Sequence, residues 1–414
     1  MEGRDLGVAV IMTASTHVRT AARLALDPRA ALAAGRMRAW RVHAYGALSE
    51  LHLEEARVPP LRAPDDVLVR VSAASLNPID VAMIGGYGAR ALNTLRALDG
   101  EDDIEFPLVP GRDFVGTVER AGPFSRLRPG TRVWGVVPPH RQGSHAEFVV
   151  VKDHWAGPAP STLKDHAAGG ALYAALTACS ALRAAGLPPD GPALTGGAAQ
   201  TRVLLLGLGG VGQAALQLLV QRNIEVTVGC SGEQSKLAEE LGAAQVFDRH
   251  RDDYDRRLES GGPYLAVLDC AGLGGGEASA RRWSFARYVT LTTPLLRHMD
   301  ARGVAPGALA AGAELLAQGA RAAGAKLRGG APAPCAALLP PHVRWAFFSP
   351  RAEDVALLHR LAERHQFIVC VEQAFPWWRG GEAYERAARG GARGKLVLDF
   401  SAARGPAGAS GSMD

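Results

Sequence analysis

The chain of 414 residues has few cysteines, and none of them are paired by spacing. Its five cysteines are scattered, odd in number and free of any Cys-x-x-Cys pattern, which excludes a zinc ribbon or a disulfide framework and suits a reducing compartment. A large excess of charge is also missing. The net charge is +5, and residues 1–38 carry six Arg against three acids, so the composition gives no reason to expect nucleic acid as a partner.

Long apolar runs are missing with one exception, residues 203–220, which hold no charge. Eighteen residues match the length of a membrane span, but four glycines and two glutamines argue against one. The pattern instead predicts a buried strand, a glycine turn and an amphipathic helix. Gly207, Gly209 and Gly212 at the junction form a Gly-x-Gly-x-x-Gly dinucleotide-binding fingerprint, in which the glycines permit a tight turn, close approach of a pyrophosphate and packing of helix on strand. The alternative is a plain strand-to-helix turn.

Two patterns of secondary structure divide the chain. From residue 38 to about 151, short alternating strands separated by Gly and Pro turns are typical of a small β-barrel. After the glycine turn, strands alternate with helices, which predicts a parallel sheet with right-handed crossovers. Between these parts we expect a helix at 167–186, and after them, in the Ala/Gly/Pro-rich residues 301–341, a helix followed by a loop.

The N-terminal residues 1–37 are rich in Ala, Arg, Ser and Thr. This composition is similar to that of an organelle transit peptide. Glu2 and Asp5 count against this interpretation because such peptides avoid acids, and the alternative is a disordered extension. The small and polar residues 401–414 are expected to be a disordered tail.

Four motifs in this order resemble a known family. The barrel carries ASLNPID at residues 74–80 and PGRDFVGTV at 110–118, the glycine fingerprint follows, and the chain closes on GARGK at 391–395. Together they resemble the zinc-free medium-chain dehydrogenases/reductases of the quinone oxidoreductase branch, over about residues 38–400. Three further stretches are similar to the mitochondrial reticulon-interacting subgroup of that branch: residues 86–93, 288–294 and 344–348.

The resemblance implies an α/β fold made of two domains. A GroES-like β-barrel catalytic domain would take residues 38–165 and 349–400, and a Rossmann domain with a doubly wound parallel sheet would take residues 166–348. It also implies NADPH-dependent reduction of a quinone or conjugated carbonyl in mitochondria, with a link to ubiquinone metabolism. A reticulon-type membrane protein partner and a homodimer are implied as well. The alternatives are an NADPH-binding adaptor of low turnover and a mitochondrial enoyl-thioester reductase.

We expect no metal at the site. Relatives that are alcohol dehydrogenases have a metal-binding Cys where this chain has Asn77, and Gly-His-Glu where it has residues 111–113, Gly-Arg-Asp. An amide and a cation therefore replace two expected ligands, whereas catalytic zinc needs three protein ligands and an open position. The twelve histidines show no paired spacing either.

The preference for NADPH is predicted from a missing acid. An NAD enzyme usually places Asp or Glu about 20 residues beyond the fingerprint, on the ribose hydroxyls. This chain has Ser231 there, which can donate a hydrogen bond to a 2′-phosphate, and Arg249 and Lys236 offer positive charge. The alternative is that Arg249 is a solvated surface residue.

The remaining cofactor contacts follow from the resemblance by position. Gly210 and Val211 would contact the pyrophosphate, and Cys270 and Leu291 would border the nicotinamide and its ribose. Cys270 stands where Asn is common and Gly391 where His is common, so two contacts of the family are missing. Phe347 and the turn formed by Gly391, Ala392 and Arg393 would close over the cofactor, with Arg393 and Lys395 supplying basic character suited to phosphate.

Three polar residues are candidates for the chemical step: Asn77, Asp80 and Tyr87. Tyr87 lies among glycines in a loop and could be the acid that protonates the reduced product. The alternative is a packing or stacking role for Tyr87. For Asp80 the alternative is a brace of the Asn-Pro turn.

Overall fold

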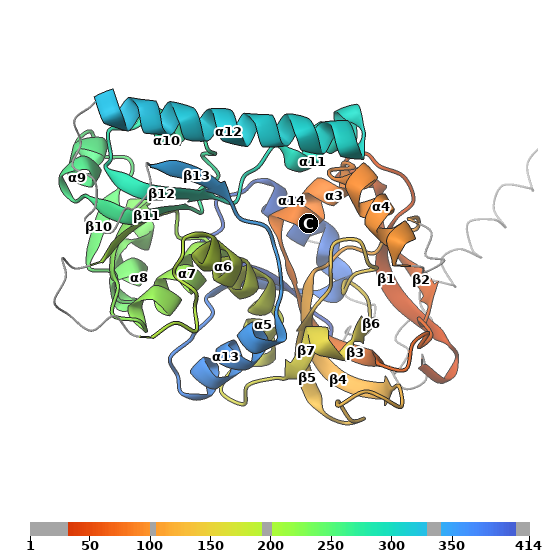
Figure 1. Cartoon of the computed structure of the whole chain (residues 1–414). Helices are drawn as coiled ribbons and strands as arrows, with labels where there is room; N and C mark the ends of the chain where they lie inside the picture. Colours follow the sequence, from red (N-terminus) through yellow and green to blue (C-terminus); the bar gives the residue numbers. More distant parts are fainter. Residues whose placement is uncertain (1–31, 100–104, 193–200, 329–340, 403–414) are drawn as a thin grey trace, which may run out of the picture.

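The computed structural model describes residues 32–99, 105–192, 201–328 and 341–402. A parallel sheet covered by helices and an antiparallel barrel lie side by side (Figure 1), which confirms the predicted α/β fold. Most of the expected targeting segment, a small-residue loop at 193–200 and all but two residues of the expected tail lie outside the described residues. Among the described residues, no helix combines the length and the apolar character needed to cross a bilayer.

The parallel sheet has six strands. Numbered along the chain, their order in space is 3-2-1-4-5-6, which is the order of a doubly wound sheet. In such sheets ligands bind at the point where the connections of two neighbouring strands run to opposite faces. That point lies between the first and fourth of these strands. The order across the sheet is β10 (Gln245–Asp248), β9 (Glu225–Cys230), β8 (Arg202–Leu206), β11 (Tyr264–Asp269), β12 (Phe285–Thr290) and β13 (His342–Trp345).

Helices cover both faces of this sheet, which explains why residues 203–206 of β8 are all apolar rather than alternating. Val203 and Leu205 pack into a core with helices of one face, whereas Leu204 and Leu206 pack into a second core with helices of the other. The first face carries α6 (Leu172–Ala184), α7 (Gly210–Val220), α8 (Ser235–Glu240) and α13 (Ala352–Glu363). The second carries α9 (Tyr254–Ser260), α10 (Glu277–Ala280) and α12 (Val304–Arg328), which runs along the top of Figure 1.

The barrel is built from both ends of the chain. Its order is β14 (Val371–Pro376), β15 (Lys395–Asp399), β3 (Asp66–Leu76), β4 (Asp113–Ala121), β5 (Arg132–Val136) and β7 (Ala156–Pro158), and β6 (Phe148–Lys152) pairs with β3. The expected alternation in β3 is present, since Val67, Val69 and Val71 fill one core and Leu68 another. A separate hairpin joins β1 (Arg36–Val42) and β2 (Leu51–Arg57).

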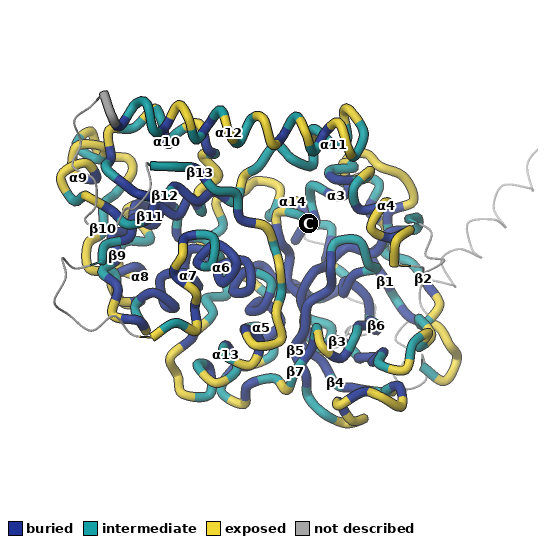
Figure 2. Tube along the Cα trace, viewed as in Figure 1, coloured by how far each residue is buried: buried dark blue, intermediate teal, exposed yellow. Residues whose placement is uncertain are grey.

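We propose that the domains keep the limits expected from the sequence. The six parallel strands all lie within residues 166–348, and the strands of the barrel sheet all lie within 38–165 and 349–400. Figure 2 shows the strands of both sheets mostly buried. Each part has a core of its own, and a third, larger core joins the two parts.

Several elements differ from the expectation. The helix expected at 167–186 is two helices, α5 (Asp165–Gly169) and α6. At their junction a Cβ on Gly169 would lie 2.7 Å from the carbonyl oxygen of Ala73, and a Cβ on Gly170 would lie 3.1 Å from the side chain of Lys395. The expected helix after residue 301 is present in α12. Four helices and one edge strand were not anticipated: α3 (Pro78–Ile84), α4 (Ala89–Leu98), α11 (Leu295–Arg302), α14 (Gly380–Ala388) and β14.

One contact fastens the barrel domain to the parallel-sheet domain near the predicted site. The Asp300 carboxylate of α11 accepts hydrogen bonds from the backbone N–H of Gly88 (2.7 Å) and of Arg90 (3.1 Å). These donors belong to the first turn of α4, which has no partner for them within the helix. The loop that carries Tyr87 is therefore held from the other domain.

Candidate active site

The glycine turn between β8 and α7 has the geometry that its sequence predicts. Gly207 has a φ of +87°, a left-handed conformation that favours glycine. A Cβ on Gly212 would lie 2.1 Å from the carbonyl oxygen of Gly207, so only glycine lets the helix pack this close to the strand. A Cβ on Gly209 would meet nothing within 4 Å, which leaves the backbone open to a ligand. The turn fits a dinucleotide pyrophosphate at the start of α7.

A cleft of about 570 Å³ opens over this turn, between the two domains and at the reversal point of the sheet. This volume is within the range of small-molecule sites. Eleven predicted residues line it: Asn77, Gly207, Gly209, Gly210, Val211, Ser231, Arg249, Cys270, Gly391, Ala392 and Arg393. Six do not: Asp80, Tyr87, Gly212, Lys236, Leu291 and Phe347.

Two of these six are exposed to solvent. The Lys236 side chain is 88% exposed, with its ammonium 3.8 Å from Glu240 on the same helix. Phe347 is also exposed, whereas the next residue, Phe348, stacks on Tyr173 with the ring centres 4.3 Å apart. Of these two adjacent phenylalanines, the one that stacks on Tyr173 is therefore partly buried and the other is exposed.

Tyr87 is half-buried in the loop between α3 and α4. Burial raises the pKa of its phenol, Arg297 opposes this rise and Asp300 adds to it. A phenol with a raised pKa stays protonated at neutral pH and is a weaker acid.

Positively and negatively charged side chains both line the end of the cleft that would take the adenosine. Ser231 follows β9 and lies 3.3 Å from the Gln234 amide oxygen, and the Arg249 side chain is exposed at the rim. The sequence analysis overlooked Glu233, whose carboxylate also lines this end. Glu233 is paired with Arg393 at 2.5 Å, and this ion pair spans the cleft from one domain to the other.

At the other end, Asn77 is the centre of a buried polar network. Its amide nitrogen donates to Asp113 (3.0 Å) and more weakly to Ser75 (3.3 Å), and the hydroxyl of Ser75 donates to the same carboxylate oxygen at 2.5 Å. The amide oxygen of Asn77 accepts a hydrogen bond from the ammonium of Lys395 at 2.7 Å. Both polar atoms of Asn77 are therefore engaged within the protein. Lys395 also lines the cleft. The sequence predicted only a basic residue suited to phosphate at this position, and not its bond to Asn77.

The pKa values of the two ionisable groups of this network, Lys395 and Asp113, are shifted from their ordinary values. Burial lowers the pKa of Lys395, and the nearby carboxylates of Asp113 and Asp80 oppose this shift. Burial raises the pKa of Asp113, and Lys395, Ser75 and Asn77 oppose that shift. Burial opposes the charge on each group, because charge is costly away from water, while the opposite charge of the partner favours it.

Asp80 braces the barrel. One of its carboxylate oxygens accepts the N–H of Asn77 (2.8 Å), and the other accepts the N–H of Gly111 (2.9 Å) and lies 3.4 Å from Arg112. The side chain has no exposed surface. Since Asp80 is fully buried and its oxygens bind the protein, the bracing alternative describes its place in this structure.

Arg112 is fully buried beside Asp80 and binds three backbone carbonyls. Its guanidinium donates to the carbonyl oxygens of Pro138 and Arg141, both at 2.9 Å, and of Val109 at 3.0 Å. A guanidinium has five donors and no acceptor, so it cannot be a metal ligand. It joins two loop segments of the barrel instead, the one before β4 and the one between β5 and β6.

Cys270 follows β11 and borders the cleft. Its backbone N–H donates to Leu206 at 2.9 Å, which places it beside the end of β8. Burial raises the pKa of its thiol, and Asp269 adds to the rise. The side chain is therefore a thiol at neutral pH and gives the cleft a weakly polar wall beside the end of β8.

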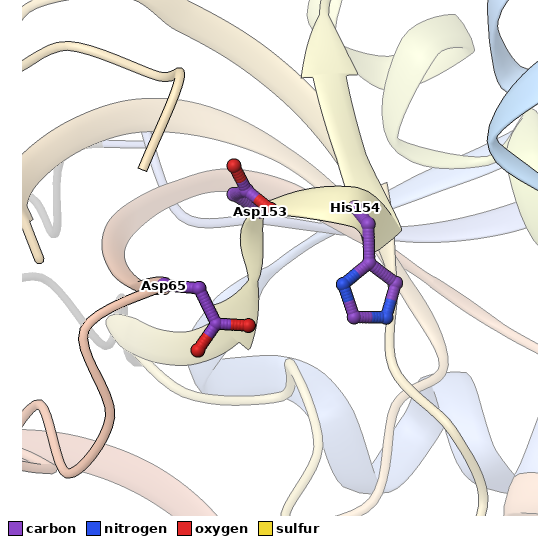
Figure 3. Close-up of side chains that lie close together, drawn as sticks. All are labelled: Asp65, Asp153 and His154. Atoms are coloured by element: carbon purple, nitrogen blue, oxygen red, sulfur yellow. The ribbon is translucent and has the colours of Figure 1, made fainter. Parts of the chain in front are cut away.

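Among the described residues, one group of three potential metal ligands lies close together: Asp65, Asp153 and His154 (Figure 3). None of them lines the cleft. Asp65 is paired with Lys152 at 3.0 Å, and Asp153 accepts from the Nε of Arg126 at 3.2 Å. These cations already balance the two carboxylates, so the cluster is a set of surface ion pairs.

Comparisons with known proteins agree with this geometry. Residues 63–161 match the alcohol dehydrogenase GroES-like domain, and residues 241–398 match a family described as zinc-binding dehydrogenase. The solved structure of the quinone oxidoreductase from Coxiella burnetii superposes with a TM-score of 0.65 at 22% identity, covering 88% of this chain and 99% of that chain, which shows the fold.

Two animal relatives match over most of the chain. The mitochondrial NAD(P)H oxidoreductase RTN4IP1 of Drosophila melanogaster is 38% identical over 380 residues, which is 90% of this chain and 89% of the relative. The mitochondrial reticulon-4-interacting protein 1 of Caenorhabditis elegans is 34% identical over 380 residues, 88% of this chain and 95% of the relative. These relatives confirm the expected mitochondrial location. The chain is therefore an oxidoreductase of the medium-chain dehydrogenase/reductase family and belongs to the mitochondrial group that these relatives form.

Proposed function

We propose that the protein transfers hydride from NADPH to a quinone or conjugated carbonyl without a metal. The observation that carries the proposal is the cleft itself. The glycine turn lies in the middle, with positive charge at the adenosine end and the Asn77–Lys395 network at the other. The names of the relatives support a nicotinamide cofactor, and a quinone is the acceptor that the similar solved structure names.

NADPH is favoured over NADH by the charges at the adenosine end. No carboxylate stands at the position of Ser231, and the Glu233 carboxylate nearby is neutralised by Arg393. Arg249 is exposed at the rim with only its neighbour His250 near its Nε, at 3.3 Å. A guanidinium in this place can bind a 2′-phosphate by charge-assisted hydrogen bonds.

Replacing Arg249 with glutamate is expected to raise the KM for NADPH by about 10- to 100-fold, since a charge-assisted bond contributes about 1.5–3 kcal/mol. The KM for NADH is expected to change by less than about threefold, because NADH has no 2′-phosphate. Initial rates with each cofactor measure the two effects. Arg251→Glu is the matched control, since Arg251 is also exposed but pairs with Asp253 outside the cleft. Equal effects on both cofactors would contradict the assignment.

The substrate class is tested by mixing purified protein with NADPH and simple quinones or enones and following the absorbance of the reduced nicotinamide. Consumption that is unchanged after treatment with EDTA is the expected result, because an amide and a buried guanidinium replace two metal ligands. Loss of activity with EDTA and its return with zinc would contradict the metal-free proposal. Tight NADPH binding without consumption would instead favour the adaptor, and consumption restricted to enoyl thioesters would favour the thioester reductase.

A reticulon-type membrane protein is the partner we propose. The support is the name of the Caenorhabditis elegans relative, which describes that protein as reticulon-interacting. A homodimer and a link to ubiquinone metabolism also remain proposals. Size-exclusion chromatography with light scattering tests the first of these two, and ubiquinone content in cells that lack the protein tests the second.

A further inference from the structure

We propose that Lys395 is the acid that protonates the reduced product, with its ammonium next to Asn77 at the inner end of the cleft. This inference rests on the proposed function and names a residue for its proton transfer. It replaces Tyr87, which does not line the cleft, and Asn77, whose polar atoms are already engaged.

Lys395 reaches the site from the first residue of β15. Its aliphatic chain passes the start of α7, where a Cβ on Gly210 would lie 3.2 Å from the lysine Cδ. The side chain is nearly buried, with 7% of the residue exposed, and it lines the cleft. It therefore lies between the pyrophosphate turn and the barrel residues.

The ammonium has donors to spare. A lysine ammonium has three N–H donors, and one of them binds the amide oxygen of Asn77. The structure gives it no other hydrogen bond among the described residues. The other two donors are available to an oxygen that enters the cleft beside Asn77.

A lysine at this position, rather than an arginine, favours a role in proton transfer over a role that needs only positive charge. The chain has only five lysines among its 46 Lys and Arg residues. Arginine would supply the same charge, but its guanidinium does not release a proton in proteins, whereas a buried lysine does so readily. A lysine in this place can therefore perform a step that the much more abundant cation of this chain cannot.

The proposed step balances as follows. The acceptor takes up a hydride, and with it two electrons, from the reduced nicotinamide, and negative charge develops on its oxygen. An N–H bond of Lys395 breaks as the O–H bond of the product forms. The neutral amine then regains a proton from water, so one quinone, one NADPH and one proton give one hydroquinone and one NADP⁺.

The surroundings of Lys395 decide when it holds this proton. The ionisable groups that act on it are Asp113 and Asp80, which favour the ammonium, while burial disfavours it more strongly. The neighbouring His145 is buried, and burial lowers its pKa, so it adds little positive charge. Burial thus lowers the pKa of Lys395 below the ordinary lysine value of 10.5, which makes its ammonium a stronger acid than that of an exposed lysine.

Three variants test the proposal by kcat and by the Kd for NADPH. Lys395→Met is expected to lower kcat for quinone by about 100-fold or more, the usual contribution of a general acid, with less than about a threefold change in Kd. Lys395→Arg keeps the positive charge but cannot release a proton, and it is expected to lower kcat nearly as much. The matched control is Lys326→Met. Lys326 is equally buried, its pKa is also lowered by burial, and it lies on α12 outside the cleft, bound to the carbonyl oxygen of Arg281.

Two further measurements separate an acid from a structural residue. In the wild type, kcat should fall as the pH rises through a pKa below 10.5. Nuclear magnetic resonance of ¹³C-labelled lysine side chains should show, among the five lysine signals, one that titrates over the same pH range and is missing in Lys395→Met. In Lys395→Ala, added alkylamines should restore part of kcat. The Tm of each variant shows that it is folded.

Each contrary outcome has a distinct meaning. A kcat for Lys395→Met within threefold of the wild type would overturn the role of Lys395 while the proposed function stands. A raised Kd for NADPH with an unchanged rate in a single turnover would make Lys395 a cofactor anchor and overturn the acid. A wild type that consumes no NADPH with any acceptor would overturn the proposed function and the acid together.

Discussion

Replacing Arg112 with methionine is expected to lower the free energy of unfolding by about 3–5 kcal/mol, the usual effect of removing one partner of a buried ion pair. The guanidinium has no exposed surface, and it binds three carbonyls from two separate loop segments. Methionine fills much of the volume but leaves those carbonyls and the Asp80 carboxylate with fewer partners. Urea denaturation followed by tryptophan fluorescence measures the change.

The control for Arg112 is Arg249→Met, because Arg249 is exposed and its loss is expected to change the unfolding free energy by less than about 0.5 kcal/mol. Arg112→Lys is expected to fall between the two, since lysine keeps the charge and has only three donors. A loss below 1 kcal/mol for Arg112→Met would show that the loops of the barrel hold without the guanidinium.

Substituting alanine for Gly212 is expected to weaken NADPH binding by more than about 100-fold and to lower the Tm. The new Cβ would lie 2.1 Å from the carbonyl oxygen of Gly207, and because both atoms belong to backbone or Cβ, no flexible side chain can move aside. The start of α7 must shift away from β8, and the N–H groups that face the pyrophosphate shift with it. Fluorescence titration with NADPH and thermal melting report the two effects.

Two other Gly→Ala variants isolate these effects. At Gly209 the backbone is extended and the Cβ meets nothing, so Gly209→Ala is expected to keep the wild-type Tm and to weaken only NADPH binding. At Gly319, inside α12, alanine also finds open space and is expected to stabilise the protein by about 0.5–1 kcal/mol without affecting binding. NADPH binding of Gly212→Ala that matches the wild type would contradict the assigned role of the turn.

The parts of the site that the sequence could predict are local ones. The fingerprint spans six residues, and its glycines act through their own backbone and that of their immediate neighbours, so spacing alone located the turn. Ser231 and Arg249 were found in the same way, because each directly follows a parallel strand and the carboxyl ends of such strands meet at one edge of the sheet.

The parts that could not be predicted depend on contacts between distant residues. Lys395 lies 318 positions from Asn77, and no periodicity links the two. Arg112 could be seen to replace a metal ligand, but not to bind three loop carbonyls. Tyr87 and Lys236 have the right chemistry for the site, yet the packing of α4 against α11 and the orientation of α8 keep them from lining the cleft.

The position of β15 in the barrel sheet has a consequence for how the chain is made. β3 is among the first strands to leave the ribosome. β6 pairs with the first half of one of its edges, but residues 73–76 on that edge stay unpaired until β15, at residues 395–399, has been synthesised. An unpaired edge is prone to join other chains, so the nascent barrel needs protection while the rest of the protein emerges. A stop codon that removed only the last twenty residues would delete both this strand and Lys395, and would leave a chain that can neither close its barrel nor complete the inner end of its cleft.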